Sequence, residues 1–345
     1  MVQKPTIMKK VTIFKSAILA LLACVGIVAC DKSSDVVPEE PEVYTVNLGW
    51  EGEILDVSYE PLATRATTDD LYGIQVYSAP DNDAATPTWT KFAYGVFDDP
   101  DNITINLLKG YKYKFVATMV KDGKNRVGSN VVGYFSPFYV SNAPAELNKF
   151  NFSAQYGLDG LGIGNTNLKN PKGIYFRPNT ERFYGELVDY VPGANGNKAK
   201  IHMKRTSFKA KFIAKGKLAK SGTLNIMMTE APEMNLELSS NNQISDMFTF
   251  SDVDAAWADN QYSETIDVTL TWTRTDGTVV PLNTHKVNFK RNATTVVKVT
   301  IENDANAGEL GFEIDDTPIT EGDDANPDVE ITDGESVKTN VSTNH

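Results

Sequence analysis

Apolar residues recur at every second position in several stretches of this 345-residue chain. The stretches are residues 44–50, 72–76, 111–119, 208–214, 266–272 and 297–301. This period places the apolar side chains on one face of an extended strand, where a core can cover them. Apolar repeats of helical period are short, and only residues 251–260 predict a short helix. The sequence therefore predicts an all-β chain built from antiparallel β-sandwiches.

Turn residues and glycine-rich stretches divide this chain, whose length suggests roughly two domains. Asp122-Gly123 and Asp276-Gly277 predict hairpin turns, because Asp and Gly tolerate the positive φ that such turns require. Residues 191–198 are rich in Pro, Gly and Asn and predict a domain boundary. We expect the following units: an N-terminal domain over residues 43–195, a C-terminal domain over 196–314 and an acidic tail over 315–345.

The formal net charge is −12, and it is concentrated at the C-terminal end. Residues 302–345 contain 13 acidic residues and one lysine, so the rest of the chain is balanced. A block of like charge is typical of a solvated tail or an interaction arm. Nucleic-acid binding needs a basic surface that meets phosphate, so we expect no nucleic-acid partner.

The N-terminal residues are typical of an export signal. Lys9, Lys10 and Lys15 precede an uncharged, mostly apolar run of 14 residues over positions 16–29. A span of the bilayer takes about 20 residues, so this run is better suited to a signal peptide. The run ends in small residues before Cys30, which resembles the bacterial lipobox. We expect a lipoprotein signal peptide over 1–29, a lipid on Cys30 and an acidic tether over 30–42. The alternative is an ordinary secretory signal with an incidental cysteine.

Residues that carry out catalysis or hold metals are sparse. The only cysteines, Cys24 and Cys30, lie in or directly after the signal, and His202, His285 and His345 are scattered. This pattern favours neither a nucleophilic triad nor a zinc site, so we expect no enzymatic activity, no cofactor and no metal. The glycines over 157–164 lack the Lys-Ser/Thr of a phosphate loop and predict an ordinary loop. The acidic residues over 98–102 offer oxygen ligands for calcium, but a turn explains them better.

Four segments, in their order along the chain, resemble the fimbrillin family of Bacteroidales pilins. They are the lipobox, the polar loop Glu60–Asp70 between two strand-like runs, the segment Met203–Phe212 and the segment Phe289–Val299. The resemblance runs from the lipobox to about residue 301. It implies two tandem transthyretin-like antiparallel β-sandwich domains and a structural subunit of a cell-surface fimbria with a role in adhesion.

The resemblance also implies a processing step. The first strand, residues 43–59, would be removed by an Arg-specific protease that cuts in the loop 60–70, between Arg65 and Ala66. The removable strand carries its apolar side chains on one face: Tyr44, Val46, Leu48 and Trp50. The implied partners are other fimbrial subunits, joined by donor-strand exchange, together with the protease and the outer membrane, which the lipid on Cys30 would enter.

Elementary energetics agree with this mechanism. Each buried apolar side chain contributes about 1.5–3 kcal/mol, so removal of such a strand would expose a hydrophobic groove with unpaired backbone groups. A strand from a neighbouring subunit can fill such a groove, and head-to-tail contacts of this type grow filaments. The tail alternates apolar and polar residues only weakly, which leaves a non-polymerising tip or anchor subunit open. A surface glycan-binding lipoprotein is the second alternative, with Trp89, Phe92 and Tyr94 as a sugar-stacking platform if they are not core residues.

Overall fold

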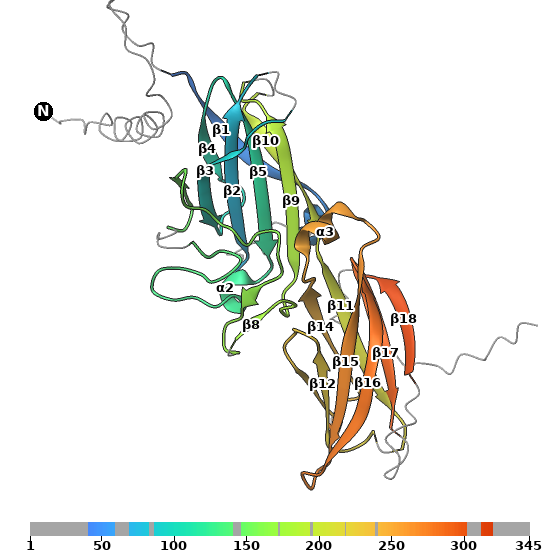
Figure 1. Cartoon of the computed structure of the whole chain (residues 1–345). Helices are drawn as coiled ribbons and strands as arrows, with labels where there is room; N and C mark the ends of the chain where they lie inside the picture. Colours follow the sequence, from blue (N-terminus) through green and yellow to red (C-terminus); the bar gives the residue numbers. More distant parts are fainter. Residues whose placement is uncertain are drawn as a thin grey trace, which may run out of the picture.

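The computed structural model describes nine ranges of the chain, namely residues 41–58, 69–82, 86–140, 146–171, 173–193, 196–217, 219–238, 241–301 and 312–319. Within them the chain is almost entirely β, and it forms two domains that lie end to end (Figure 1). The all-β fold class predicted from the alternation is confirmed.

The N-terminal domain is built on one eight-stranded sheet with the order β4-β1-β10-β9-β5-β2-β3-β6. Its strands are β1 (Val43–Gly52), β2 (Leu71–Pro80), β3 (Thr90–Phe97), β4 (Thr104–Leu108), β5 (Tyr111–Val120), β6 (Lys149–Phe152), β9 (Arg182–Tyr190) and β10 (Lys198–Arg205). A six-residue 3₁₀ helix, η1 (Glu53–Ser58), follows β1 directly. A short helix and a small ribbon complete the domain: α2 (Gly123–Arg126), β7 (Thr166–Asn167) and β8 (Ile174–Tyr175).

This sheet folds over on itself to enclose a core. The rings of Trp50 on β1 and Tyr72 on β2 lie 5.2 Å apart, although four strand spacings separate these strands in the sheet order. In a flat sheet four spacings would amount to about 19 Å. The strands β4, β1 and β10 therefore face the other half of the sheet across one apolar core.

The C-terminal domain is a sandwich of two four-stranded sheets, with the orders β14-β11-β17-β18 and β13-β12-β15-β16. The first sheet contains β11 (Ser207–Lys215), β14 (Gln243–Thr249), β17 (Ala293–Thr300) and β18 (Phe312–Pro318). The second contains β12 (Thr223–Met228), β13 (Met234–Glu237), β15 (Ser263–Thr273) and β16 (Val279–Lys290). The inward-facing residues of both sheets form one core, which includes the buried Trp272. The expected helix is α3 (Val253–Ala258), which lies at the junction with the N-terminal domain (Figure 1).

Most strand pairs are antiparallel, as expected, but two pairs are parallel. They are β1 with β10 and β11 with β17. The alternation of apolar residues sets which face of a strand is buried, whereas the direction of its neighbour depends on long-range topology. The predicted antiparallel character therefore holds for most strand pairs, and these two pairs are exceptions to it.

The expected domain boundary at 195/196 moves to Thr206. Lys198–Arg205 form β10, which pairs with β9 in the N-terminal sheet. Asn197 has a φ of 56° and its side chain accepts a hydrogen bond from Gly193 N, so this stretch is part of a hairpin connection instead of a linker. Only Thr206 separates β10 from β11, and the chain therefore passes from one domain to the next almost without a break.

Three smaller expectations also change. The first strand ends at Gly52 and not at position 59, because Gly52 adopts a φ of 86° before η1 begins. Asp122-Gly123 opens the helical turn α2, whereas Asp276-Gly277 does lie in the hairpin between β15 and β16. The expected tail from position 315 overlaps β18, which pairs with β17 as far as Pro318.

Candidate functional site

The first strand, β1, occupies an interior position in the N-terminal sheet. It pairs with β4 on one side and with β10 on the other. Additional backbone hydrogen bonds run from Leu48 N to Ile103 O and from Asn47 N to Asn197 O, each 2.9 Å long. In the sheet order β4 and β10 are joined only through β1. Departure of β1 would therefore leave a strand-wide groove with two unpaired edges.

The apolar side chains of β1 point into the core of the N-terminal domain. Val46 and Leu48 are buried, and Tyr44 and Trp50 are half-buried against the same core. The indole N–H of Trp50 donates to Pro100 O over 3.3 Å. The four residues expected on the removable strand thus lie on one face, and this face covers the core.

One residue of η1 extends this contact beyond the expected set. Ile54 is buried in the same core as β1. Gly52 lets the chain turn into η1, since a Cβ there would meet Met203 O at 2.7 Å. The alternation of β1 ends at Trp50, so the sequence pattern carries no signal for Ile54 or for its neighbour Glu53.

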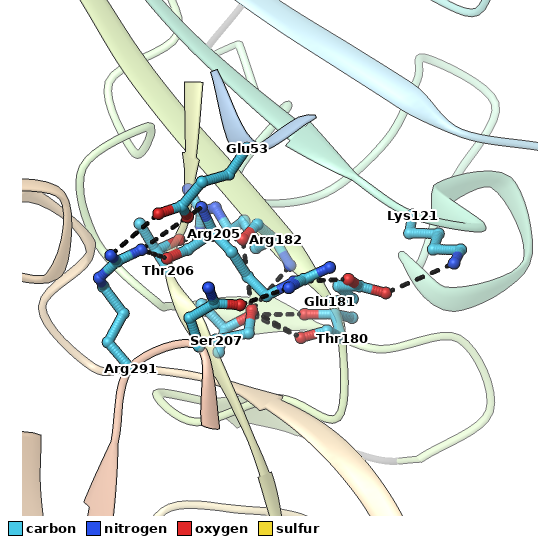
Figure 2. Close-up of polar contacts among 11 residues, drawn as sticks. Glu53, Lys121, Thr180, Glu181, Arg182, Arg205, Thr206, Ser207 and Arg291 are labelled. Atoms are coloured by element: carbon cyan, nitrogen blue, oxygen red, sulfur yellow. Dashed lines mark hydrogen bonds and ion pairs between the residues drawn. The ribbon is translucent and has the colours of Figure 1, made fainter. Parts of the chain in front are cut away.

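Glu53 links the end of β1 to the C-terminal domain (Figure 2). Its Oε2 accepts hydrogen bonds from Arg205 N and from Arg291 Nη1, both 2.7 Å long. Its Oε1 accepts a further hydrogen bond of 3.0 Å from Arg291 Nη2. The side chain of Arg291 is only 5% exposed, and Arg291 follows β16 in the C-terminal sandwich. The carboxylate is thus held by a bidentate guanidinium and one backbone N–H.

Other polar groups at the junction already have partners. Arg205 Nε donates to Glu181 Oε1 over 2.8 Å, and Arg205 Nη1 donates to Asn292 Oδ1. Glu181 also forms an ion pair with Lys121 at 3.6 Å (Figure 2). Thr206 N, at the domain boundary, donates to Arg182 O over 2.8 Å. The junction is therefore a polar network in which Glu53 supplies the carboxylate for Arg291.

The pKa of Glu53 lies below the usual range of a glutamate. Burial opposes this, but the hydrogen bonds from Arg291 and Arg205 N and the charges of both arginines outweigh it. A folded-state pKa below the unfolded value, about 4.3, stabilises the fold above that pH, and this stabilisation is lost as the pH falls through the folded pKa. Glu53 should therefore contribute at neutral pH and not in strong acid.

We predict that Glu53→Gln lowers the free energy of unfolding by about 1–3 kcal/mol at pH 7. The difference from the native chain should shrink as the pH falls below about 4, where the native carboxylate also becomes protonated. Denaturant unfolding from pH 7 to pH 3 measures this difference. Glu51→Gln is the matched control. Glu51 lies on the same segment, but its side chain is 45% exposed and its contact with His202 Nδ1 is long, at 4.0 Å. Equal losses for the two variants at pH 7 would contradict the prediction.

The residues expected at the lipidation and cleavage sites lie outside the described ranges. These are Cys30, Arg65 and Ala66. The described chain ends at Ser58 before the expected cleavage loop and resumes at Asp69 after it. None of the helices within the described ranges is both long and apolar enough to span a membrane.

The aromatic platform proposed for sugar binding does not form. Tyr94 and Phe92 are buried, and they belong to cores on opposite sides of β3. Only Trp89 is partly exposed. Sugar stacking needs exposed ring faces that lie side by side. Phe92 and Tyr94 offer none, because both are core residues.

The other polar candidates from the sequence have structural partners. Asp98 binds Lys124 at 2.6 Å, and Asp99 accepts a hydrogen bond from the side chain of Asn102. In the part of the chain that the structure describes, no group of three or more His, Cys, Asp or Glu residues is placed to hold a metal ion. The glycine-rich loop over 157–164 presents carbonyl oxygens to the buried guanidinium of Arg182, so it is a packed loop.

Comparison with known proteins gave matches among solved structures alone. No protein-family model and no curated protein matches the chain. A candidate cell adhesion protein from Bacteroides eggerthii is 12% identical, with a TM-score of 0.38, over 83% of this chain and 98% of that one. The tip fimbrial protein Mfa3 from Porphyromonas gingivalis, with C-terminal truncation, is 10% identical, with a TM-score of 0.33, over 74% of this chain and 97% of that one.

The fimbrial anchor protein Mfa2 from Porphyromonas gingivalis is 9% identical to this chain, with a TM-score of 0.33. The match covers 81% of this chain and 98% of Mfa2. The structural neighbours of this chain are therefore adhesin candidates and fimbrial proteins, at low sequence identity and low structural overlap.

Proposed function

We propose that this chain is a structural subunit of a cell-surface fimbria, with a role in adhesion. It is exported as a lipoprotein with the lipid on Cys30, cut between Arg65 and Ala66 by an Arg-specific protease, and joined to other subunits by donor-strand exchange. Its place is the outer membrane at first and the fimbria after processing. It has no catalytic role and needs no cofactor.

The interior position of β1 carries this proposal. An edge strand can leave a sheet and create one new edge, whereas β1 lies between β4 and β10 and covers the core with Val46 and Leu48. Its loss opens a groove that offers backbone hydrogen bonds on both sides and an apolar floor. Such a groove favours the addition of another extended segment. Head-to-tail repetition of this contact gives a filament.

The chain upstream of the expected cut is suited to removal. The described ranges resume at Asp69, beyond the expected cut, and β2 follows at Leu71. Cleavage after Arg65 would therefore separate β1 and η1 covalently from every other described element. Only noncovalent contacts would then hold β1 in place, and a strand from another subunit can compete for the same contacts.

We predict that protein recovered from the cell surface begins at Ala66, whereas the variants Arg65→Ala and Arg65→Lys begin at a lipidated Cys30. Arg65→Lys keeps the positive charge, so it separates recognition by an Arg-specific protease from a general effect of charge. Mass spectrometry of the N-terminal peptide, with electron microscopy of surface filaments, measures both outcomes. A native protein that begins at Cys30 on every molecule would contradict processing and would favour an anchor subunit.

A non-polymerising tip or anchor subunit is the second candidate. The composition of the C-terminal end favours it, because residues 302–345 carry 13 acidic residues and few large apolar ones. A donor strand has to fill an apolar groove, and such a segment buries little apolar surface. A subunit that accepts a strand but donates none would terminate a filament.

A further inference from the structure

Departure of β1 and η1 would remove the charge partner of Arg291 at the end of the groove next to the C-terminal domain. The guanidinium of Arg291 is held by Glu53 through both terminal nitrogens, and its side chain is 5% exposed. Arg291 Nη1 also donates to Arg205 O over 2.8 Å, which fixes the guanidinium against β10. A buried charge without its partner is costly, so the vacated site favours a new carboxylate.

No carboxylate that stays in the described part of the subunit takes this position. Glu181, the other acid labelled in Figure 2, accepts a hydrogen bond from Arg205 Nε and pairs with Lys121. The third donor at the site, Arg205 N, is a backbone group and points at Glu53 Oε2 over 2.7 Å. Two guanidinium donors and one backbone N–H converge on a single carboxylate.

We propose that this carboxylate site selects the strand that enters the groove, which has to come from another subunit and carry Glu or Asp at the place of Glu53. The inference rests on the proposed function and deepens it, because it states the chemistry of the incoming segment. In the direction of β1 the acid lies seven residues after Val46, the first buried apolar residue. The required pattern is therefore three apolar residues at alternate positions, with an acid three residues after the last of them.

The chain's own C-terminal end does not fit this pattern. Within residues 302–345 the one alternating triplet of large apolar residues is Leu310, Phe312 and Ile314. The residue three positions later is Thr317, which carries no charge. The structure moreover pairs Phe312–Pro318 with β17 of the same subunit. The expected occupant is thus a segment of a different chain, and not the C-terminal end of a second copy of this one.

The test uses the chain from Asp31 onward with a unique protease site in place of residues 60–68. After the cut, a labelled synthetic peptide of residues 43–58 replaces the original strand, and unlabelled peptides then compete with it. Fluorescence anisotropy measures the competition. The Glu53→Gln peptide should compete about tenfold or more weakly than the native peptide, because it leaves Arg291 without a charge partner. The Glu51→Gln peptide, which loses the same charge two residues away, should match the native peptide within about twofold.

The protein variant Arg291→Met completes a double-mutant cycle. In this variant the difference between the native and Glu53→Gln peptides should shrink to the part due to Arg205, because the Arg291 guanidinium is gone. The comparison of peptides on the unaltered protein stands without this variant if Arg291→Met fails to fold. Equal competition by the Glu53→Gln and Glu51→Gln peptides would overturn the proposal and leave strand exchange intact. A cut protein that takes up no labelled peptide would contradict strand exchange itself, and this proposal with it.

Discussion

A chain that begins at Ala66 is expected to lose the cooperative fold of its N-terminal domain, or to recover it only by pairing with another chain. The deletion removes three buried apolar side chains from the core, namely Val46, Leu48 and Ile54. Each contributes about 1.5–3 kcal/mol, so the gross loss is about 5–9 kcal/mol. Net stabilities of natural domains are about 5–15 kcal/mol, so a loss of this size reaches the stability of the whole domain.

Backbone groups add to this loss. The deletion leaves β4 and β10 each with an unpaired edge, and Arg291 loses the carboxylate of Glu53. The C-terminal sandwich has a separate core, so its own unfolding transition should persist. Hydrogen exchange should therefore show lost protection in β4 and β10 and retained protection in β12 and β15. Unfolding curves should show one transition for the chain from Ala66 and two transitions for the chain that keeps β1, which would report the same change.

The chain from Asp31 is the matched control, because it differs only by the tether, the strand and the loop. Size-exclusion chromatography separates the two expected fates of the shorter chain, which are a partly unfolded monomer and an oligomer paired through the open edges of β4 and β10. Addition of the peptide 43–58 should restore the N-terminal transition and dissolve the oligomer. A monomer from Ala66 with unchanged unfolding and exchange would show that β1 is dispensable, and it would contradict the proposed groove.

The pattern of alternate apolar residues predicts the strands well but not their partners. Tyr44, Val46, Leu48 and Trp50 share one face because the side-chain period of a strand is two, and that much is local. That β1 lies between β4 and β10, parallel to the latter, depends on segments about 60 and 150 residues away. The residues of a strand alone do not determine which distant strands pair with it or in which direction they run. The fold class was therefore predictable, whereas the interior place of β1 became visible only in the structure.

The polar part of the candidate site was not predictable for a related reason. Glu53 and Arg291 lie 238 positions apart, and neither belongs to a motif with a characteristic spacing. A single glutamate after a strand and a single arginine in a turn are usually solvated. Only the fold brings them together at the domain junction. The boundary at Thr206 was missed similarly, because the Gly- and Asn-rich stretch before β10 has the composition of both a linker and a hairpin turn.

Arg182→Met is expected to lower the free energy of unfolding by about 3–5 kcal/mol. Arg182 is fully buried, and it ties the loop over 157–164 to β9 of the N-terminal sheet. Its Nη1 donates to Ile163 O and its Nη2 to Leu161 O, both over 2.6 Å. Its Nε donates to Thr118 Oγ1 over 2.8 Å. Burial lowers the pKa of Arg182 to about 9, so the side chain remains charged at neutral pH.

The cost arises because methionine fills much of the space but donates no hydrogen bond. The carbonyl oxygens of Gly160, Leu161 and Ile163 and the hydroxyl of Thr118 would lose this donor. Each buried group left without a donor costs about 1–3 kcal/mol. The loop over 157–164 also contacts the C-terminal domain, where Gly164 N donates to Ser251 O over 3.0 Å. Loosening of this loop should therefore weaken the junction between the domains as well as the N-terminal core.

Urea unfolding at pH 7 measures the loss, with Arg126→Met as the matched control. Arg126 lies in the same domain, but its side chain is 43% exposed and its nearest acid, Asp122, is 3.7 Å away. Its replacement should change the free energy of unfolding by less than about 0.5 kcal/mol.

Arg182→Lys keeps the charge but cannot place three donating nitrogens as the guanidinium does, so an intermediate loss is expected. A loss for Arg182→Met no larger than that of the control would show that water or a shifted loop satisfies the carbonyl oxygens. The buried guanidinium would then not be what holds this loop in place.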